Sequence, residues 1–129
     1  MIFFLLLLLV PAVFADISTV RGVLACQGKT LANVTIALWE RDILVDPDDH
    51  LNTVVSRENG EFEIIGEEHE FIGDIEPYIL IDHTCNVKAG CKRITKYNVP
   101  KAYSNRIYEM TIIILDIPSL EDNIICPED

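Results

Sequence analysis

The amino-acid sequence predicts an all-β protein, a sandwich of seven short antiparallel strands. Short runs of β-branched, aliphatic and aromatic residues alternate with clusters of Gly, Asn, Pro and Asp, which are turn residues. No segment has sustained helical periodicity, and a single helical turn near residues 99–103 is the most helix that the pattern supports. Four cysteines are enough for two disulfides, which fits a small sandwich outside the cytosol.

The first fifteen residues, 1–15, indicate a secretory signal peptide. An apolar run, Ile2–Val10, is followed by the small-residue cleavage pattern Val13-Phe14-Ala15. A membrane anchor is the alternative, but the apolar run is shorter than the ~20 residues that span a bilayer. We therefore expect a secreted, extracellular protein whose mature chain, residues 16–129, forms one domain with no membrane span.

The mature chain opens with two predicted strands. Val20–Cys26 is the first, and Gln27–Thr30 is a turn in which glycine provides the special backbone angles. Asn33–Glu40 is the second strand, and its period-two apolar positions are expected to face the core: Val34, Ile36 and Leu38. Asn33 has the opposite parity and begins an Asn-Val-Thr acceptor for N-glycosylation. A sequon left unoccupied by the transferase is the alternative.

An acidic segment, Asp42–His50, separates the second strand from the third. Asp46-Pro47-Asp48-Asp49 could suggest calcium ligands, since hard cations prefer carboxylates. The segment lacks the central glycine and the closing glutamate of an EF-type loop. We predict a solvated acidic turn here, with no metal site and no cofactor.

The third and fourth strands are predicted at Leu51–Arg57 and Glu61–Ile64. Glu58-Asn59-Gly60 between them contains the Asn-Gly signal of a tight hairpin turn. The fourth strand alternates polar and apolar residues, as a half-buried strand does. An acidic connection, Gly66–Gly73, follows it.

The last three predicted strands include the one that we expect at the centre of the core. Tyr78–Ile81 is apolar on both faces, as a central strand would be, and Pro77 is compatible only with a strand start. Lys92–Tyr97 follows the next loop, and Val99-Pro100 ends it. Tyr108–Ile117 is apolar on both parities, which predicts a buried last strand.

Four cysteines in a secreted chain favour two disulfides over a metal site. Neither Cys-x-x-Cys nor a histidine pair with ligand spacing is present. The loop between Cys85 and Cys91 brings these two within reach, so we predict this pair and, by elimination, Cys26 with Cys126. Four free thiols are the alternative.

The chain is acidic, with a net charge of −11 and a pI near 4.5, which argues against nucleic acid as a partner. One window between His83 and Tyr108 contains basic residues and no acidic residue. We interpret this window as a binding face for an anionic partner: a phospholipid headgroup, a sulfated glycan or an acidic protein. Its members are Lys88, Lys92, Arg93, Lys96, Lys101 and Arg106. A solvated face that balances the acidic loops is the alternative.

Strand alternation limits how this basic window can be arranged. It places Lys92 and Lys96 on one face of their strand and Arg93 on the other. A continuous patch therefore requires a basic residue from an adjoining loop, Lys88, Lys101 or Arg106, to lie beside one of them.

Several short motifs follow one another along nearly the whole mature chain. They are Arg21–Cys26 with Gly28-Lys29, Asn33-Val34, Asp46–Asp49, Asn59–Phe62, Ile75–Tyr78, His83–Asn86, and Gly90–Arg93 before Val99-Pro100. In this order and spacing the chain resembles the nematode transthyretin-like family, secreted relatives of transthyretin. The resemblance implies a seven-stranded transthyretin-like sandwich, secretion, and an extracellular adaptor or carrier role, but no particular ligand.

Two alternative functions belong to relatives of that family. The hydroxyisourate hydrolases have a catalytic signature that includes a C-terminal Tyr-Arg-Gly-Ser, whereas this chain ends with Ile125–Asp129. A carrier of a small hydrophobic ligand would use a channel between sandwiches, and nothing in the sequence marks one. We therefore predict a non-enzymatic extracellular binding or adaptor protein, with the carrier and the enzyme as alternatives.

The histidines give the enzyme little support. Of His50, His69 and His83, only His83 lies on a predicted strand, the one that starts at Pro77 and runs out at Cys85, and it has the parity of the core-facing Ile79 and Ile81. No serine, cysteine or second histidine is placed beside it by the sequence. We predict a structural role for His83.

Overall fold

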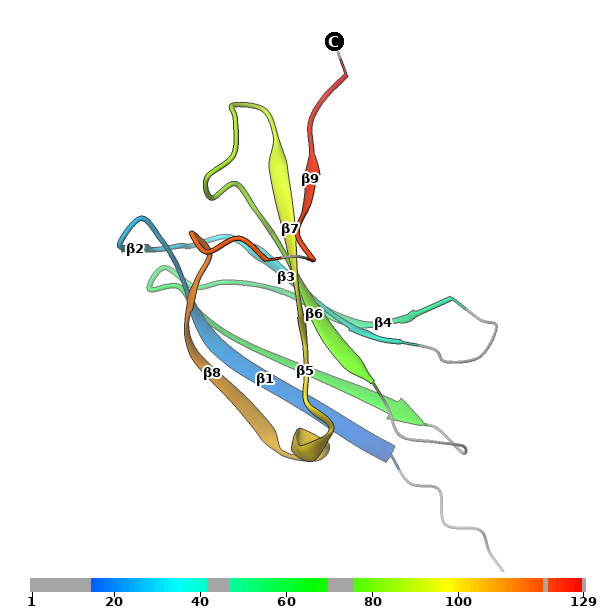
Figure 1. Cartoon of the computed structure of the whole chain (residues 1–129). Coiled ribbons are helices and arrows are strands. Elements are labelled where there is room, and N and C mark those ends of the chain that lie inside the picture. The colour runs from blue at the N-terminus through cyan, green and yellow to red at the C-terminus, as the bar shows by residue number, and fades with distance from the viewer. Residues whose placement is uncertain (1–14, 42–46, 70–75, 120, 129) are drawn as a thin grey trace, which may run out of the picture.

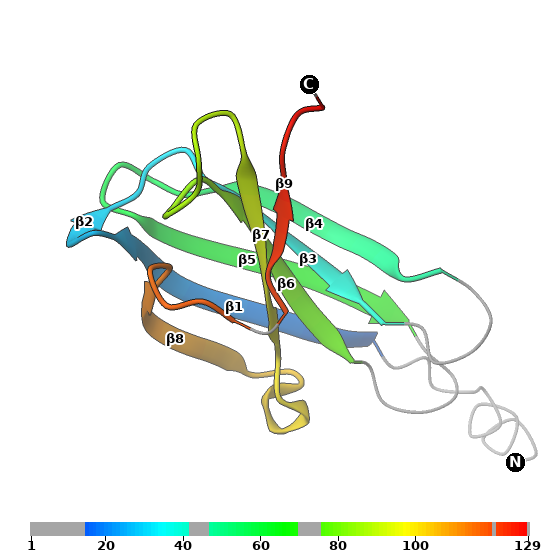
Figure 2. The ribbon, with the colours of Figure 1, turned by 45° about the horizontal axis from the view of Figure 1, so that its top comes forward.

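The computed structural model describes residues 15–41, 47–69, 76–119 and 121–128, and it shows two β-sheets that pack face to face (Figures 1 and 2). This part of the chain forms strands β1 to β9 and one 3-10 turn, Lys101–Tyr103. All seven predicted strands are present, and two short strands, β2 and β9, are additional. The all-β sandwich with two disulfides is confirmed.

The first sheet is built around β1 (Ala15–Cys26). Its partners are the antiparallel strands β2 (Lys29–Thr30) and β5 (Glu61–His69), and β8 (Ile107–Ile114) on the other side. The β1–β8 pairing is parallel, so the expectation of a wholly antiparallel sandwich is wrong at this one pair. The strand β5 is also longer than predicted, and it includes part of the expected acidic connection.

The second sheet has the order β4-β3-β6-β7-β9, and every pairing in it is antiparallel. Its strands are β3 (Thr35–Glu40), β4 (Asp49–Val55), β6 (Pro77–His83), β7 (Lys92–Asn98) and β9 (Asn123–Ile125). As predicted, β6 lies at the centre, and its proline stands at its first residue, where a missing N–H is tolerated.

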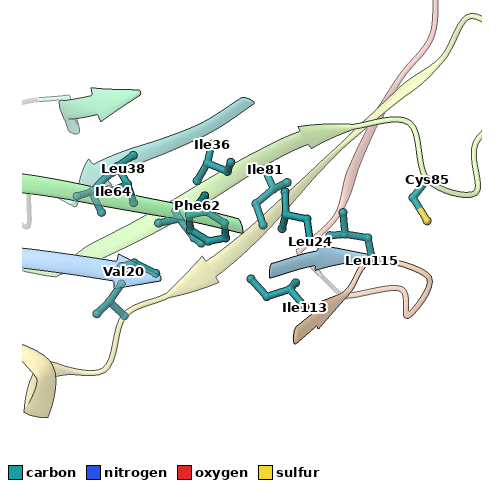
Figure 3. Close-up of a cluster of buried hydrophobic side chains, with 12 residues drawn as sticks. Val20, Leu24, Ile36, Leu38, Phe62, Ile64, Ile81, Cys85, Ile113 and Leu115 are labelled. Carbon is teal, nitrogen blue, oxygen red and sulfur yellow. The ribbon is translucent and has the colours of Figure 1, made fainter. Parts of the chain in front are cut away.

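The core lies between the two sheets (Figure 3). Every second residue of β1, β3 and β6 points inward, because successive side chains of a strand alternate between faces. Fully buried members are Val20, Leu24, Ile36, Leu38, Ile64, Ile79, Ile81 and Leu115. The predicted inward placement of Ile36 and Leu38 is confirmed, and Val34 is partly buried against the same cluster.

One side of the sandwich is closed by the turn between β4 and β5. The predicted turn is present: Gly60 has a φ of 83°, and its N–H donates to Arg57 O at 2.9 Å. The two strands nevertheless pair in different sheets, so the turn links the sheets instead of forming a simple hairpin. Gly66 of β5 is buried there, and an added Cβ would lie 2.7 Å from Leu38 Cδ2 and 2.8 Å from Leu51 Cβ.

The opposite side contains the clearest departure from the sequence prediction. The strand β8 was expected to be buried, but among the described residues it pairs with β1 alone and forms an edge. Its inward residue Ile113 is 5% exposed, whereas Ile112 is 64% exposed and Ile114 49%. An apolar residue at every position therefore reflects a buried inner face and an apolar outer face, not a central strand.

The predicted disulfide pairing is wrong. The structure pairs Cys26 with Cys85 and Cys91 with Cys126, and no cysteine among the described residues is free. The unpredicted strand β9 explains the second pair: Lys92 lies opposite Ile125, so the next residues outward, Cys91 and Cys126, face each other across the two strands. Cys85 instead turns inward, 4% exposed, and bonds to the end of β1 in the other sheet.

Three sequence predictions fall outside the described residues. They concern the leader as far as residue 14, residues 42–46 of the acidic segment, and residues 70–73 of the acidic connection. Within the described residues, no helix has the length and apolar character needed to cross a membrane.

Candidate functional site

The predicted basic window is centred on β7, whose side chains alternate between the two faces of its sheet. Lys92 and Lys96 point to the outer face, and Arg93 and Thr95 point into the sandwich. Lys92 Nζ donates to Asp82 Oδ2 of β6 at 3.1 Å, in an exposed ion pair. The charge of Lys92 is therefore partly balanced by its neighbouring strand.

Lys96 is held by an aromatic ring. Its Nζ lies 4.4 Å from the centroid of Tyr78, the neighbouring aromatic residue on β6, in a cation–π contact. The Tyr78 hydroxyl donates to Asp48 Oδ2 at 2.5 Å, and burial followed by this hydrogen bond raises the pKa of Tyr78 to about 12. The ring therefore stays neutral, and among the described residues Lys96 makes no ion pair.

A cleft of about 270 Å³ lies at the C-terminal end of β7. Arg41 and Lys101 line it together with Asn98 and Glu76. Lys101 Nζ lies 3.8 Å from Glu76 Oε1, and the backbone N–H of Arg41 donates to Glu76 O at 2.9 Å. Arg41 makes no side-chain ion pair within the described residues.

We call these four basic residues the cationic face: Arg41, Lys92, Lys96 and Lys101. They follow β7 from its first residue to the turn beyond its last, roughly 20 Å, so together they suit an extended anionic surface and not one small ligand. Three of them belong to the predicted window, and Arg41 was missed. No local pattern marks Arg41, because it comes from the end of β3 and reaches the cleft only through the pairing of β3 with β6.

The predicted window does not form one continuous patch. Lys88 lies in the β6–β7 loop and Arg106 follows the 3-10 turn, at opposite ends of β7 (Figure 1). A seven-residue strand is roughly 20 Å long, so these two exposed side chains cannot act together with one small ligand. Neither joins the cationic face through a contact within the described residues.

Arg93 also has to be removed from the predicted binding face. It is 4% exposed, and its Nε lies 3.2 Å from Asp122 Oδ2. Its guanidinium donates to the backbone oxygens of Cys85, at 2.9 Å, and Leu115. A buried arginine persists only when it is paired and hydrogen-bonded, and here it fastens the C-terminal segment to β7.

His83 has the structural environment that the sequence predicts. It is 3% exposed, its Nδ1 accepts from the Cys85 N–H at 3.1 Å, and its Nε2 lies 2.8 Å from Thr95 Oγ1. The accepting Nδ1 makes Nε2 the protonated nitrogen of the neutral ring. Burial, with a smaller contribution from the Arg93 charge, lowers the pKa of His83.

The other histidines do not complete a catalytic group with His83. His50 is exposed on β4, packs edge-on against Trp39, and its Nε2 lies 2.6 Å from Thr53 Oγ1. The side chain of His69 lies outside the described part of the structure. His83 thus has both ring nitrogens engaged in the interior.

One group of three carboxylates in the described residues is close enough to be considered as a metal site. Oxygens of Glu40, Asp49 and Glu68 lie within 4.8 Å of one another, and Glu40 is 1% exposed. None of the three side chains is without an interaction partner in the protein. Carboxylates at this spacing are compatible with Ca²⁺, but proximity alone does not define a metal site.

Comparison with known proteins identifies the family. The model "TTR-52: Transthyretin-like family" matches residues 21–100. The chain belongs to the transthyretin-like family. Transthyretin-like protein 16 of Caenorhabditis elegans is 48% identical over 100 residues, covering 77% of this chain and 74% of that protein. Transthyretin-like protein 5 of the same nematode is 36% identical over 104 residues, covering 74% and 73%.

The transthyretin-like match includes β1 from Arg21 onward, strands β2 to β7 and both residues of the Cys26–Cys85 disulfide, but it ends before β8 and β9. Among solved structures, a 9R-lipoxygenase from Cyanothece PCC8801 is similar at 20% identity with a TM-score of 0.48, over 79% of this chain and 16% of that one. The family assignment therefore rests on the sequence relatives.

Proposed function

We propose that this transthyretin-like protein is a secreted, non-enzymatic extracellular binding protein that engages an anionic partner through its cationic face. The observation that carries the proposal is the pair Lys96 and Arg41, whose charges have no ion-pair partner among the described residues. Lys92 and Lys101 flank them. To bind the ligand, Lys92 would have to break its ion pair with Asp82, and Lys101 its ion pair with Glu76. Those exposed ion pairs are weak, so the exchange costs little.

The charge distribution of the chain supports this mode of binding. Each basic residue near an anionic membrane contributes about 1 kcal/mol, and this attraction falls when salt shortens the Debye length to about 8 Å at physiological ionic strength. The net charge of −11 repels an anionic surface overall, so only the orientation with the cationic face turned toward it is favourable.

The experiment compares the mature protein with a double variant, Lys92→Glu with Lys96→Glu, for binding to vesicles rich in anionic phospholipid and to heparin. The matched control is Lys29→Glu with Arg57→Glu, which changes the net charge equally at two exposed residues, on β2 and in the β4–β5 turn, away from the face. We expect binding at low salt that the first pair abolishes and the control preserves. Equal loss in both variants, or no binding by the wild type, would exclude the cationic face as the binding site.

Secretion is supported by the two disulfides and by the position of the sequon. Asn33 is exposed, has a φ of 60°, and lies in the turn before β3, not within the strand. In this turn the side chain is accessible to a glycosyl transferase. Intact mass of protein expressed in a eukaryotic secretory host, before and after glycosidase and alkylation, tests this. We expect a chain that begins at Asp16, has a glycan at Asn33 and incorporates no alkyl group. Retention of the leader in the purified protein would contradict secretion.

A further inference from the structure

The exposed edge of β8 is an apolar surface that the cationic face does not use. Leu115 N–H donates to Ala25 O of β1 at 2.9 Å. Because successive N–H groups of an extended strand point to opposite sides, those of Ile114 and Ile112 point away from β1, toward the edge. Natural edge strands are usually protected by lysine, proline or a bulge.

The protection of β8 is incomplete. The register with β1 shifts between Arg21 and Val23, and Thr111 has a φ of 59°, which indicates a bulge in the middle of β8. Beyond it, Ile112–Ile114 is in regular register and contains neither lysine nor proline. The unprotected edge is therefore short, and it suits a short extended segment.

Two surface recesses meet at this edge, and both include Ile112 and Ile114. One, of about 330 Å³, lies over Val23 and Ala25 on the outer face of the sheet. The other, also of about 330 Å³, lies on the free side of β8, and its lining includes Met110, Ile117 and Pro118. Side chains that alternate above and below an added strand would enter the two recesses in turn.

The charges at the two ends of this edge select the partner. Glu109 precedes the apolar segment and Asp116 follows it. Within the described residues neither makes an ion pair; Glu109 Oε1 accepts from the Thr111 N–H at 3.3 Å, and Asp116 accepts from the Gln27 N–H at 3.0 Å. A strand laid along the edge would meet a carboxylate at each end.

A second copy of the chain fits this arrangement poorly. Antiparallel pairing of two β8 edges about Ile113 would bring Asp116 of one copy beside Met110 and Glu109 of the other. Like charges at such positions are destabilising, and two chains of net charge −11 also repel at long range.

We propose that the β8 edge, Met110–Ile114, binds an extended segment of another protein whose central residues are β-branched, so that each face presents methyl groups to one recess, and which has a basic residue at each end. Main-chain hydrogen bonds to Ile112 and Ile114 would provide affinity, and the two recesses and two carboxylates would provide specificity. This surface is separate from the cationic face, so the two proposals can fail independently.

The test uses fluorescence anisotropy with the mature protein and two labelled synthetic peptides, Lys-Val-Thr-Val-Thr-Val-Lys and Glu-Val-Thr-Val-Thr-Val-Glu. We expect saturable binding of the lysine peptide and about tenfold weaker binding of the glutamate peptide, since two charge pairs are reversed. Ile112→Lys should also weaken the lysine peptide about tenfold or more. Ile65→Lys is the matched control, because it adds the same charge at an exposed isoleucine on β5, away from β8.

Three results would overturn the proposal. One is the absence of saturable binding of the lysine peptide up to about 1 mM, the weak limit of a specific contact. Another is equal weakening by Ile112→Lys and Ile65→Lys, which would mean non-specific attraction to an acidic protein. The third, from sedimentation velocity, is a wild-type dimer that Ile112→Lys dissociates, which would assign the edge to a second copy.

Discussion

The two sides of this sandwich, where the edges of its sheets meet, differ in how far they are closed. On the β4–β5 side, a tight turn joins the sheets, and Asn52 Nδ2 donates to Ile65 O across the gap at 2.8 Å. On the β7–β8 side, β9 covers only the first three residues of β7, and β8 pairs with nothing beyond β1 in the described structure. Both candidate binding surfaces flank this second side. The connections from β7 to β8 and from β8 to β9 also cross between the sheets on the second side, so what is available for recognition there is the unpaired edge of β8.

The largest expected effect comes from the disulfide that joins the two sheets. Replacing Cys26 and Cys85 by alanine should lower the free energy of unfolding by about 4 kcal/mol, because the crosslink restricts a long loop in the unfolded chain. Replacing Cys91 and Cys126 should lower the free energy of unfolding by less, since β9 consists of three exposed residues that can detach while the core stays folded. Urea denaturation without reductant measures both, and a larger loss for the second pair would contradict this view of the open side.

The next effect tests the closed side. Gly66→Val should destabilise the protein by about 3 kcal/mol, since the new side chain overlaps Leu38 and Leu51. Ile65→Val, at the next residue but 48% exposed, should change stability by less than about 0.5 kcal/mol. Thermal denaturation of the two variants decides, and equal melting temperatures would show that β4 and β5 are not closely packed.

His83→Gln should lower the free energy of unfolding by about 2 kcal/mol, because glutamine cannot reproduce both buried hydrogen bonds of the imidazole. Thermal denaturation of the wild type and the variant is the first measurement. Hydroxyisourate turnover is the second measurement on the same pair of proteins. An unchanged melting temperature together with turnover that only the wild type shows would establish a catalytic role and contradict the structural one.

The same residue predicts a pH dependence. The pKa of His83 is lowered from 6.5 in the folded state, so below this pH the unfolded chain binds a proton that the folded protein does not. Its contribution to stability is therefore complete above about pH 6.5 and decreases as the pH falls. The stability difference between wild type and His83→Gln should shrink from about pH 7.5 to about pH 5, and a constant difference would contradict the burial of a neutral imidazole.

Local patterns in the sequence were sufficient to predict the strands, the turn at Gly60 and the inward positions of β3. They were not sufficient to predict that β8 is an edge strand. Its inner face packs on the core and its outer face is exposed, but both faces have the same apolar composition. The central strand β6 has this composition too, and only the neighbours of each strand distinguish the two.

The disulfide pairing and the cationic face depend on contacts between distant segments. Cys126 meets Cys91 because three residues of β9 pair with β7, and such a short exposed strand has almost no sequence signal. The burial of Arg93 could not be predicted from its own strand, because it depends on the ion pair with Asp122, a residue distant in the sequence. Arg41 joins the basic residues of β7 only through the order of strands in the sheet.

The smallest expected effect is the most direct test of the open side. Ile112→Lys should change the free energy of unfolding by less than about 0.5 kcal/mol, because its side chain is 64% exposed and loses few contacts. Ile113→Lys, one residue along the same strand, should prevent folding, since it would bury an unpaired charge in the core. Urea denaturation of the first variant and circular dichroism of the second measure the contrast. A large loss of stability in Ile112→Lys would mean that the β8 edge is packed, and therefore that it is not available to a partner.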